Sequence, residues 1–279
     1  MEKYSVLMSV YHKEDPEYLS AAITSMLEQT APPDDYVIVC DGPLNEALDR
    51  VLEDFASRYP DVMQIVRLPE NIGVGLAAKE GLQYCRNELV AKMDSDDLSV
   101  PDRCQRQLEE FERDPELTLL GGFIEEFDTL TGEPFALRQV SGDHEGICRH
   151  ARRRCPMNNV TVMYKKSAVL AVGSYRDLRR AEDYDLFSRL LIAGYRAKNI
   201  EDVLVKVRVD PNSHRRRSGL PVLKACSSIW WNSYRKKFSS LGDLLFCMVG
   251  GVGLFLCPSF LQKLLYNSFL RKKVPKGKA

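Results

Sequence analysis

The sequence of 279 residues predicts an α/β fold, in which helices cover both faces of a mostly parallel sheet. Three observations support this prediction. Short β-prone runs alternate with amphipathic helical patterns through the first hundred residues. The β-prone runs are almost wholly apolar, as strands buried on both faces are. At least one of them ends in a turn signal, Asp41-Gly42-Pro43.

The expected elements follow one another regularly. Four strands are expected at residues 5–10, 36–40, 64–68 and 89–93. Three helices lie between them: one that begins at Asp15-Pro16, one over residues 44–55 and one over residues 76–84. Residues 117–172 are expected to be α+β, with strand-like pieces at 118–127 and 161–164. A helix at 184–193 and a strand at 203–209 complete the expected fold.

Acidic residues follow the ends of two expected strands. Asp41 follows the second strand, and Asp94-Ser95-Asp96-Asp97 follows the fourth. Ligands of parallel sheets bind beyond the carboxyl ends of the strands. Three carboxylates so close together repel one another unless a cation offsets them, and hard oxygen ligands suit Mg²⁺ or Mn²⁺. The alternatives are a solvated acidic turn, or a helix near Pro101 that Asp97 caps.

Two further motifs are candidate parts of a site. Asn71-Ile72-Gly73-Val74-Gly75 opens the third helix, where glycines let the backbone approach a phosphate or ribose. The alternative is a simple glycine-rich turn, since neither a P-loop nor a dinucleotide fingerprint is present. Glu182-Asp183-Tyr184-Asp185 opens a later helix. Its acids either complement the helix dipole or supply a general base.

Basic residues cluster at two places. Arg208, His214 and Arg215-Arg216-Arg217 lie at or after the last expected strand, where they either face a diphosphate or form a solvated loop. Arg152-Arg153-Arg154 is expected to be solvated surface, unless the acceptor of the reaction carries a phosphate.

The two ends of the chain differ in charge. After Asp210 there are 13 Lys and Arg and one acid, Asp243, a net of 13 − 1 = +12, so the rest carries −12. Residues 244–262 contain no charge and are flanked by basic clusters. This segment is either a buried helical pair, a hairpin seated in the membrane surface or a membrane-spanning helix.

We expect two parts of the chain, a domain at 1–212 and a helical, membrane-associating extension at 213–279. The basic extension should meet an anionic partner such as a membrane surface. Nucleic acid is not expected, because the apolar residues are contiguous and not interleaved with the basic ones.

The cysteines and the N-terminal residues indicate the cellular compartment of the protein. The eight Cys are scattered without a metal-binding spacing, and Cys40 is expected to pack at a strand end. No secretion signal precedes the first strand. Reduced thiols in a cytosolic protein are therefore expected.

Five motifs, taken in order, resemble the signature series of family 2 glycosyltransferases: Ser9-Val10-Tyr11, Asp41-Gly42, Asn71-x-Gly73, Asp94-Ser95-Asp96-Asp97 and Glu182-Asp183-Tyr184-Asp185. The resemblance covers residues 3–212 and implies the GT-A fold, an αβα sandwich. The longer phrases around His12 and Asp183 are similar to bacterial enzymes that build O-antigen, capsule and other exopolysaccharide.

The resemblance implies a role for several residues. Val10 and Tyr11 would line the base pocket, and Asp41 would accept a hydrogen bond from the uracil imide. Asp94 would contact the ribose side of the donor, and Asp96 would bind Mn²⁺ or Mg²⁺ together with the diphosphate.

The remaining implied roles concern catalysis. Asp97 would be a further metal ligand or an orienting group. Asp183 would be the catalytic base, and Glu182 would contact a sugar. The chain departs from the family at Arg208-Val209-Asp210, where related enzymes often have Arg-x-His.

The implied reaction is inverting transfer of a hexose, from UDP-glucose or UDP-galactose, to give a β-glycoside. The implied acceptor is an undecaprenyl-diphosphate-linked saccharide at the cytoplasmic face of the bacterial inner membrane. One alternative is a sugar nucleotidyltransferase, against which the absence of glycines around Tyr11-His12-Lys13 counts. Another is an inactive membrane scaffold, against which the intact carboxylates count.

Overall fold

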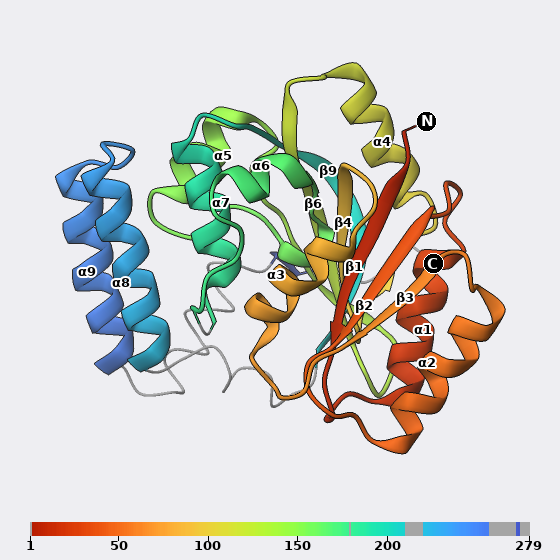
Figure 1. Ribbon diagram of the computed structural model, residues 1–279. Helices are drawn as coiled ribbons and strands as arrows, with labels where there is room; N and C mark the ends of the chain where they lie inside the picture. Colours follow the sequence, from red (N-terminus) through yellow and green to blue (C-terminus); the bar gives the residue numbers. More distant parts are fainter. Residues whose placement is uncertain (1, 179, 210–219, 257–271, 274–279) are drawn as a thin grey trace.

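The computed structural model describes residues 2–178, 180–209, 220–256 and 272–273 (Figure 1). It is a three-layer sandwich, with one ten-stranded sheet between two layers of helices. The sheet order is β10-β7-β6-β8-β4-β1-β2-β3, and β9 pairs with β6 and β5. The predicted αβα architecture is confirmed.

The N-terminal half of the sheet is parallel. Its strands are β1 (Tyr4–Val10), β2 (Asp35–Cys40), β3 (Met63–Arg67) and β4 (Leu89–Asp94). The helices that connect them are α1 (Pro16–Leu27), α2 (Glu46–Arg58) and α3 (Val74–Tyr84). Each connection crosses over the sheet in a helix, as parallel pairing requires.

The second half of the sheet is mixed. Its elements are β5 (Leu98–Ser99), α4 (Arg103–Arg113), β6 (Leu117–Asp128), β7 (Pro134–Arg138), α5 (His144–Ala151), the 3₁₀ turn η1 (Asn159–Thr161), β8 (Met163–Lys165), α6 (Lys166–Ala171), α7 (Glu182–Ile192), β9 (Arg196–Val209) and β10 (Lys272–Lys273). Strand β8 is antiparallel to both β4 and β6, whereas β9 is parallel to β6.

Each face of the sheet has its own apolar core. Helices α1, α2 and α4 cover one face through buried residues such as Ile23, Leu52 and Leu108. Helices α3, α5, α6 and α7 cover the other, with Leu82 and Phe187 among the buried residues. The start of α1 agrees with the sequence: the Asp15 carboxylate accepts the Glu17 N–H (2.8 Å), which caps the helix as predicted. Helices α2, α3 and α7 begin within two residues of their predicted starts.

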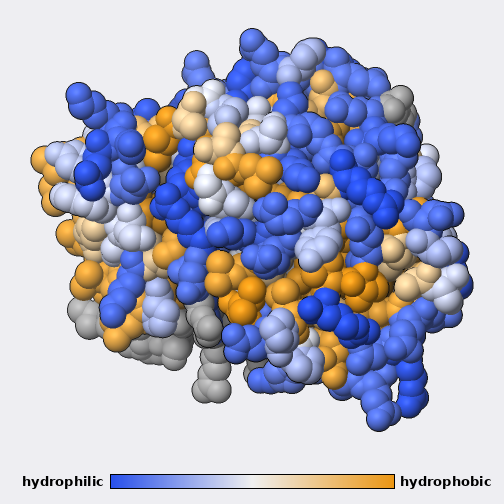
Figure 2. All heavy atoms as spheres, viewed as in Figure 1, coloured by the Kyte–Doolittle hydropathy of each residue, from blue (hydrophilic) through white to orange (hydrophobic). Residues whose placement is uncertain are grey.

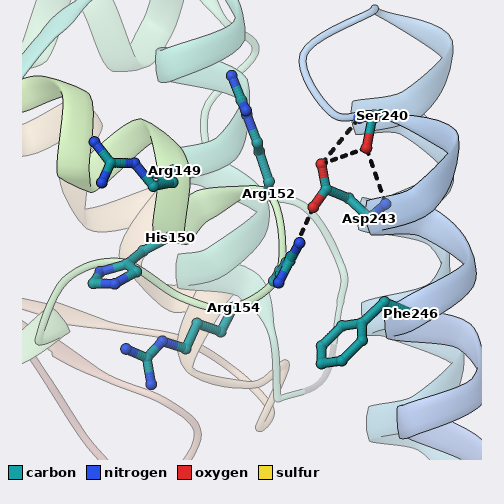
Figure 3. Close-up of a pocket in the computed structure, with 8 residues that line it drawn as sticks. Arg149, His150, Arg152, Arg154, Ser240, Asp243 and Phe246 are labelled. Carbon is teal, nitrogen blue, oxygen red and sulfur yellow. Dashed lines mark hydrogen bonds and ion pairs between the residues drawn. The ribbon is translucent and has the colours of Figure 1, made fainter.

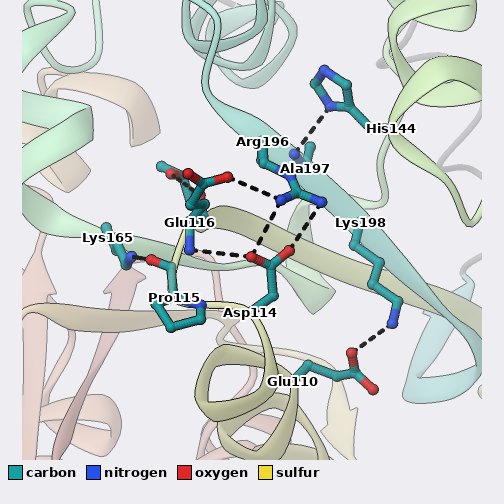
Figure 4. Close-up of polar contacts among 10 residues, drawn as sticks. Glu110, Asp114, Pro115, Glu116, His144, Lys165, Arg196, Ala197 and Lys198 are labelled. Carbon is teal, nitrogen blue, oxygen red and sulfur yellow. Dashed lines mark hydrogen bonds and ion pairs between the residues drawn. The ribbon is translucent and has the colours of Figure 1, made fainter.

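Strand β9 begins seven residues before the predicted strand at 203–209, at Arg196. Its first half carries charged residues that hide the strand pattern. Arg196 pairs with Asp114 (3.2 Å) and Glu116 (3.1 Å), and Lys198 pairs with Glu110, as Figure 4 shows. These ion pairs hold the start of β9 to the end of α4 and to the segment that joins α4 to β6.

Two helices follow the sandwich, α8 (Leu220–Arg235) and α9 (Leu241–Leu256). They pack against each other and, through Ile229, Trp230 and Leu244, against Tyr184 of α7 (Figure 1). No helix in the described part of the chain is long and apolar enough to cross a bilayer. The predicted helical extension is present, while the boundary at 212/213 and residues 257–262 lie outside the described residues.

The cysteines in the described part of the chain are free thiols. Cys40 is buried at the end of β2, as predicted.

Candidate active site

The carboxyl ends of β1, β2 and β4 meet at one edge of the sheet. In the parallel register Val10 pairs with Cys40, and Ser9 pairs with Asp94. The residues that follow these strands, including Asp41, therefore leave the sheet side by side. This is the edge at which ligands of parallel sheets bind.

Val10 and Tyr11 differ in exposure. Val10 is buried, and its carbonyl accepts the Asp41 N–H at 2.8 Å. Tyr11 is partly exposed, and its ring meets that of His12 edge to face, with centroids 5.7 Å apart. Of the two residues expected at the base pocket, only Tyr11 presents substantial side-chain surface there.

Asp41 organises the start of α3. Its buried carboxylate accepts the backbone N–H groups of Ile72 (2.7 Å) and Gly73 (3.1 Å). The Asn71 amide donates back to the Asp41 carbonyl at 3.1 Å. A Cβ on Gly42 would lie 2.8 Å from the Asn71 nitrogen, so this close approach requires glycine. Two motifs that look independent in the sequence therefore form one local structure.

The Asp94-Ser95-Asp96-Asp97 segment alternates in exposure. Asp94 and Asp96 are partly exposed, whereas Ser95 and Asp97 are buried. The alternation directs two carboxylates toward the edge of the sheet and one toward the interior. The segment is therefore not a uniformly solvated acidic turn.

Asp97 anchors the end of β9. Its carboxylate accepts the backbone N–H of Arg208 at 2.9 Å. Burial raises the pKa of Asp97 well above its usual range, and the nearby charges of Asp96 and Asp94 raise it further. Asp97 does not cap the following helix, whose N-cap residue is Asp102. Its position suits the orienting role, one of the two roles expected for it.

Arg208 lies over two aromatic rings. Its guanidinium carbon is 4.3 Å from the centroid of the Tyr18 ring and 5.1 Å from that of Phe127. Its Nε atom is buried and has no hydrogen-bond partner in the described part of the chain. A buried donor without a partner is costly, and a bound anion would satisfy it. His214, predicted beside it, lies outside the described residues.

The Glu182-Asp183-Tyr184-Asp185 segment divides in the same way. Asp185 is buried and pairs with Arg189 at 2.7 Å, and the Tyr184 hydroxyl donates to the Ala151 carbonyl at 2.8 Å. The Tyr184 hydroxyl holds α7 to the end of α5, and Arg189, which Asp185 pairs with, donates from α7 to the Val172 carbonyl at 2.6 Å. Glu182 and Asp183 are partly exposed and remain for chemistry.

The two acidic clusters share one electrostatic environment. Burial raises the pKa of Asp183 well above its usual range, and the charges of Glu182 and Asp94 raise it further. Burial and Asp94 also raise the pKa of Glu182. The fold therefore brings together acids that are about ninety positions apart in the sequence, as the separation of Asp94 and Asp183 shows.

A cavity of about 180 Å³ lies between the beginnings of α3 and α7. Gly73 and Gly75 line one side, and Arg176, Arg180 and Glu182 line the other. A Cβ on Gly75 would lie 2.9 Å from the Glu182 Cβ, so the glycine lets the two helices approach. The Asn71–Gly75 motif thus contributes to the same site as the second acidic cluster.

Lys92 is a member of the site that the sequence analysis missed. It is buried in β4, and its charge lowers the pKa values of Glu182 and Asp183 against the effect of burial. Its signal in the sequence is a single charge inside the apolar run at 89–93. A buried lysine is rare unless acids offset its charge.

The carboxylate oxygens at the sheet edge suit a divalent cation that a substrate helps to bind. Within the described ranges no cluster of three or more His, Cys, Asp or Glu is arranged to hold a metal alone. Asp94 and Asp96 nevertheless offer two partly exposed carboxylates at the sheet edge. Mg²⁺ typically binds through one or two carboxylates plus substrate phosphates, and this pair fits that pattern.

The family model for family 2 glycosyl transferases matches residues 5–179, which include the sheet edge and the first acidic cluster. The chain belongs to the family 2 glycosyltransferases.

Three relatives of this glycosyltransferase illustrate the family. An uncharacterized glycosyltransferase of Haemophilus influenzae is 38% identical over 97% of this chain and all of its own length. The amylovoran biosynthesis glycosyltransferase of Erwinia amylovora is 36% identical over 80% of this chain and 82% of its own. A UDP-Gal:α-D-GlcNAc-diphosphoundecaprenol β-1,3-galactosyltransferase of Escherichia coli is 28% identical over 97% of both chains.

Solved structures agree with the fold. A mannosyltransferase of Pyrobaculum calidifontis, determined with GDP-mannose and Mn²⁺, has a TM-score of 0.61 at 15% identity, covering 95% of this chain and 84% of its own. At this identity the likeness concerns the fold alone, and it identifies the sandwich as GT-A.

Proposed function

We propose that this glycosyltransferase transfers a hexose, from UDP-glucose or UDP-galactose, to a lipid-diphosphate-linked saccharide during synthesis of a bacterial surface polysaccharide. The transfer inverts the anomeric configuration and gives a β-glycoside. It uses Mn²⁺ or Mg²⁺ and takes place at the cytoplasmic face of the inner membrane. The observation that carries the proposal is the convergence of the two acidic clusters, since the charge of Asp94 raises the pKa values of Glu182 and Asp183.

The first cluster is assigned to the donor. Tyr11, together with the backbone of buried Val10, faces the base, and the Asp41 carboxylate has lone pairs left for a uracil imide. Asn71 and Gly73 shape the turn beside the ribose or phosphate. Each of these groups lies on or beside the ends of β1 and β2, so the nucleotide would lie across that edge.

The diphosphate is assigned to the end of β4. Asp94 would face the ribose side and Asp96 would hold the metal, while Asp97 orients the segment through its hydrogen bond to the Arg208 backbone N–H. A divalent cation there supplies Lewis-acid neutralisation of the leaving nucleoside diphosphate. The unpaired Nε of Arg208 is the further donor available to that leaving group, and His214 is assigned the same task.

Asp183 is assigned the role of general base. A carboxylate with a raised pKa accepts a proton from an acceptor hydroxyl more readily than an ordinary one, and such assistance is worth ~10²–10⁴-fold in rate. Glu182, next to it at the edge of the cavity, contacts a sugar. The acids are thereby divided into those that bind the sugar donor, Asp94 and Asp96, and a general base, Asp183. In-line inverting displacement needs both.

Two relatives support the substrate class. The name of one refers to biosynthesis of amylovoran, and that of another to transfer of galactose from UDP-Gal onto a GlcNAc-diphosphoundecaprenol. The second relative matches almost the whole chain, including the C-terminal hairpin region. An anionic membrane surface is the partner that such an acceptor implies.

A transfer assay tests the proposal. Purified protein is incubated with Mn²⁺, a panel of UDP-sugars and a synthetic lipid-diphosphate saccharide, and the product is identified by mass spectrometry and its linkage by NMR. We expect β-linked transfer of one hexose. Asp183→Asn is expected to lose ~10²–10⁴-fold in kcat. The control Asp202→Asn, at an exposed position on β9, is expected to keep wild-type activity. An Asp96→Ala variant as active as the wild type would overturn the proposal.

A further inference from the structure

The outer face of α9 is apolar along its described length. Between residues 241 and 253 every exposed position is aliphatic, aromatic or glycine. The side chains of Leu245, Phe246 and Val249 are 56%, 63% and 73% exposed. Figure 2 shows apolar surface on the hairpin at the left edge of the molecule. Contiguous apolar surface of this kind marks an interaction site.

A basic pocket opens where α9 begins (Figure 3). It measures about 660 Å³ and lies between the C-terminal end of α5 and the first turns of α9. Four arginines and His150 line one side, and Ser240, Asp243 and Phe246 line the other. Phe246 therefore belongs both to the pocket and to the apolar face of α9.

Arg153 joins the pocket to the hairpin formed by α8 and α9. Its Nε donates to the Asp243 carboxylate at 2.7 Å, and its guanidinium carbon lies 4.8 Å from the centroid of the Phe246 ring. Its carbonyl accepts the Trp230 indole N–H at 3.2 Å. The one acid of the pocket is therefore already paired and does not oppose a bound anion.

The other three arginines keep their charge available. Arg149, Arg152 and Arg154 are exposed, and none forms an ion pair with a residue of the described ranges. Partial burial lowers the pKa of His150, and the charges of Arg154 and Arg149 lower it further. The pocket therefore has a positive potential that an anion would offset.

We propose that this pocket binds the phosphate groups of anionic phospholipids while the apolar face of α9 enters the adjoining layer of acyl chains. Positive charge beside an exposed apolar helix face matches the two layers of a bilayer surface, headgroup and hydrocarbon. The occupant is therefore the surface of an anionic membrane. The inference deepens the proposed function, on which it rests for the location of the acceptor.

The docking surface adjoins the candidate base. The turn at 152–154 starts after Ala151, whose carbonyl accepts the hydroxyl of Tyr184 next to Asp183. It ends before Cys155, whose pKa burial raises to about 12, with a further contribution from the Asp183 charge. A membrane bound at this surface would present a lipid-linked acceptor on the Asp183 side.

Vesicle binding tests the inference without any sugar donor. The full chain is mixed with sucrose-loaded vesicles of phosphatidylglycerol and phosphatidylcholine, or of phosphatidylcholine alone, and sedimented. We expect binding to the anionic vesicles that salt weakens. Arg152→Gln/Arg154→Gln is expected to bind them roughly 10- to 30-fold more weakly, since each basic residue at such a surface contributes severalfold. The control Arg50→Gln/Arg113→Gln removes the same charge from α2 and α4 and is expected to bind normally.

The apolar face is tested separately. Leu245→Ser/Val249→Ser is expected to weaken vesicle binding at least about tenfold, because both side chains would leave the acyl layer. The control Leu130→Ser, at an 88% exposed position between β6 and β7, is expected to have no effect. Circular dichroism of each variant confirms that it is folded.

Four outcomes would overturn the inference. The first is equal binding of wild type to neutral and anionic vesicles, and the second is unchanged binding by both double variants. The third is binding of free pyrophosphate that needs Arg152 and Arg154 while vesicles do not compete, which would make the pocket a free-phosphate site. The fourth is a dimer in vesicle-free solution that Leu245→Ser/Val249→Ser dissociates, which would assign the face to a second copy. Because no donor is present, failure here is distinct from failure of sugar transfer.

Discussion

At the scale of single residues, the environment of Asp183 suits the proposed role of a general base. Burial disfavours its charged form, and the carboxylates of Glu182 and Asp94 do the same. The charge of Lys92, which is buried in β4, lowers the pKa of Asp183 and so opposes these effects. A carboxylate in this environment has a higher pKa than an ordinary aspartate, which makes it a stronger base.

The raised pKa predicts a pH dependence. Below its folded-state pKa Asp183 is protonated and cannot accept the acceptor proton, so kcat/KM should rise with pH through a value well above the usual range for aspartate. Lys92→Met removes the charge that lowers this pKa and should move the rising limb to higher pH. The limb should stay in place in Lys198→Met, because Lys198 pairs with Glu110 elsewhere. A limb that does not move in Lys92→Met would contradict this account.

The same pKa has a consequence for stability. Since the folded-state pKa of Asp183 is raised, the folded protein binds the proton more tightly than the unfolded chain does. The contribution of this residue to stability is therefore full below the unfolded pKa and is lost as pH rises through the folded pKa. At pH 7 Asp183→Asn should raise the free energy of unfolding, on the order of 1 kcal/mol, while lowering kcat by ~10²–10⁴-fold. Urea unfolding at pH 7 measures it, and a destabilised variant would contradict it.

At the scale of elements, the approach of α3 to α7 determines the shape of the cavity. Gly75→Ala would bring a Cβ to 2.9 Å from the Glu182 Cβ, so α7 must shift. Misplacement of a site residue by about 1 Å can cost ~10²-fold in rate, and we expect a loss approaching that size in kcat. Gly250→Ala, on α9 with open space around it, should keep activity and gain roughly 0.5–1 kcal/mol of stability. Steady-state kinetics and thermal unfolding of Gly75→Ala and Gly250→Ala test both expectations.

The end of β9 depends on Asp97. Asp97→Ala would leave the partly buried backbone N–H of Arg208 without its acceptor, at a cost of ~1–3 kcal/mol. Asp97→Asn keeps a carbonyl oxygen in the same place and removes a carboxyl group that burial already disfavours. We therefore expect Asn to be tolerated in unfolding experiments and Ala not. Equal destabilisation by the two changes would mean that the hydrogen bond is unimportant.

Most of the elements could be predicted, because their patterns are local. The four parallel strands are nearly pure apolar runs, and Asp15-Pro16 specifies the start of α1. The charged first half of β9 could not, because its pattern makes sense only beside Asp114 and Glu116. Periodicity within a strand carries no information about such partners.

The site was predictable as a set of motifs, but not as an arrangement. The position of each acid at the end of a strand or the start of a helix followed from the sequence. That Asp41 binds the backbone at Gly73, and that Asp97 faces inward to Arg208, depends on tertiary contacts. Lys92 was overlooked because its neighbours in the strand are apolar and its partners lie on other elements.

At the scale of the whole molecule, the charge is distributed unevenly along the chain. The net charge is −12 up to Asp210 and +12 after it, because that last part contains 13 basic residues and one acid. That acid, Asp243, pairs with Arg153 and joins the hairpin to the sandwich. The basic and apolar hairpin lies at one end of the molecule, beside α7 (Figure 1). In the proposed function, the edge that binds the donor and the side that receives the acceptor are built from different elements.

The central claim is that the acids divide into a donor set and a base. Calorimetric titration of UDP into the protein, with and without Mn²⁺, tests it most directly when Asp96→Ala and Asp183→Asn are compared. We predict Mn²⁺-dependent binding in the wild type, its loss in Asp96→Ala, and near wild-type binding in Asp183→Asn even though that variant transfers sugar ~10²–10⁴-fold more slowly. Unchanged Mn²⁺-dependent binding in Asp96→Ala, or its loss in Asp183→Asn, would contradict the division.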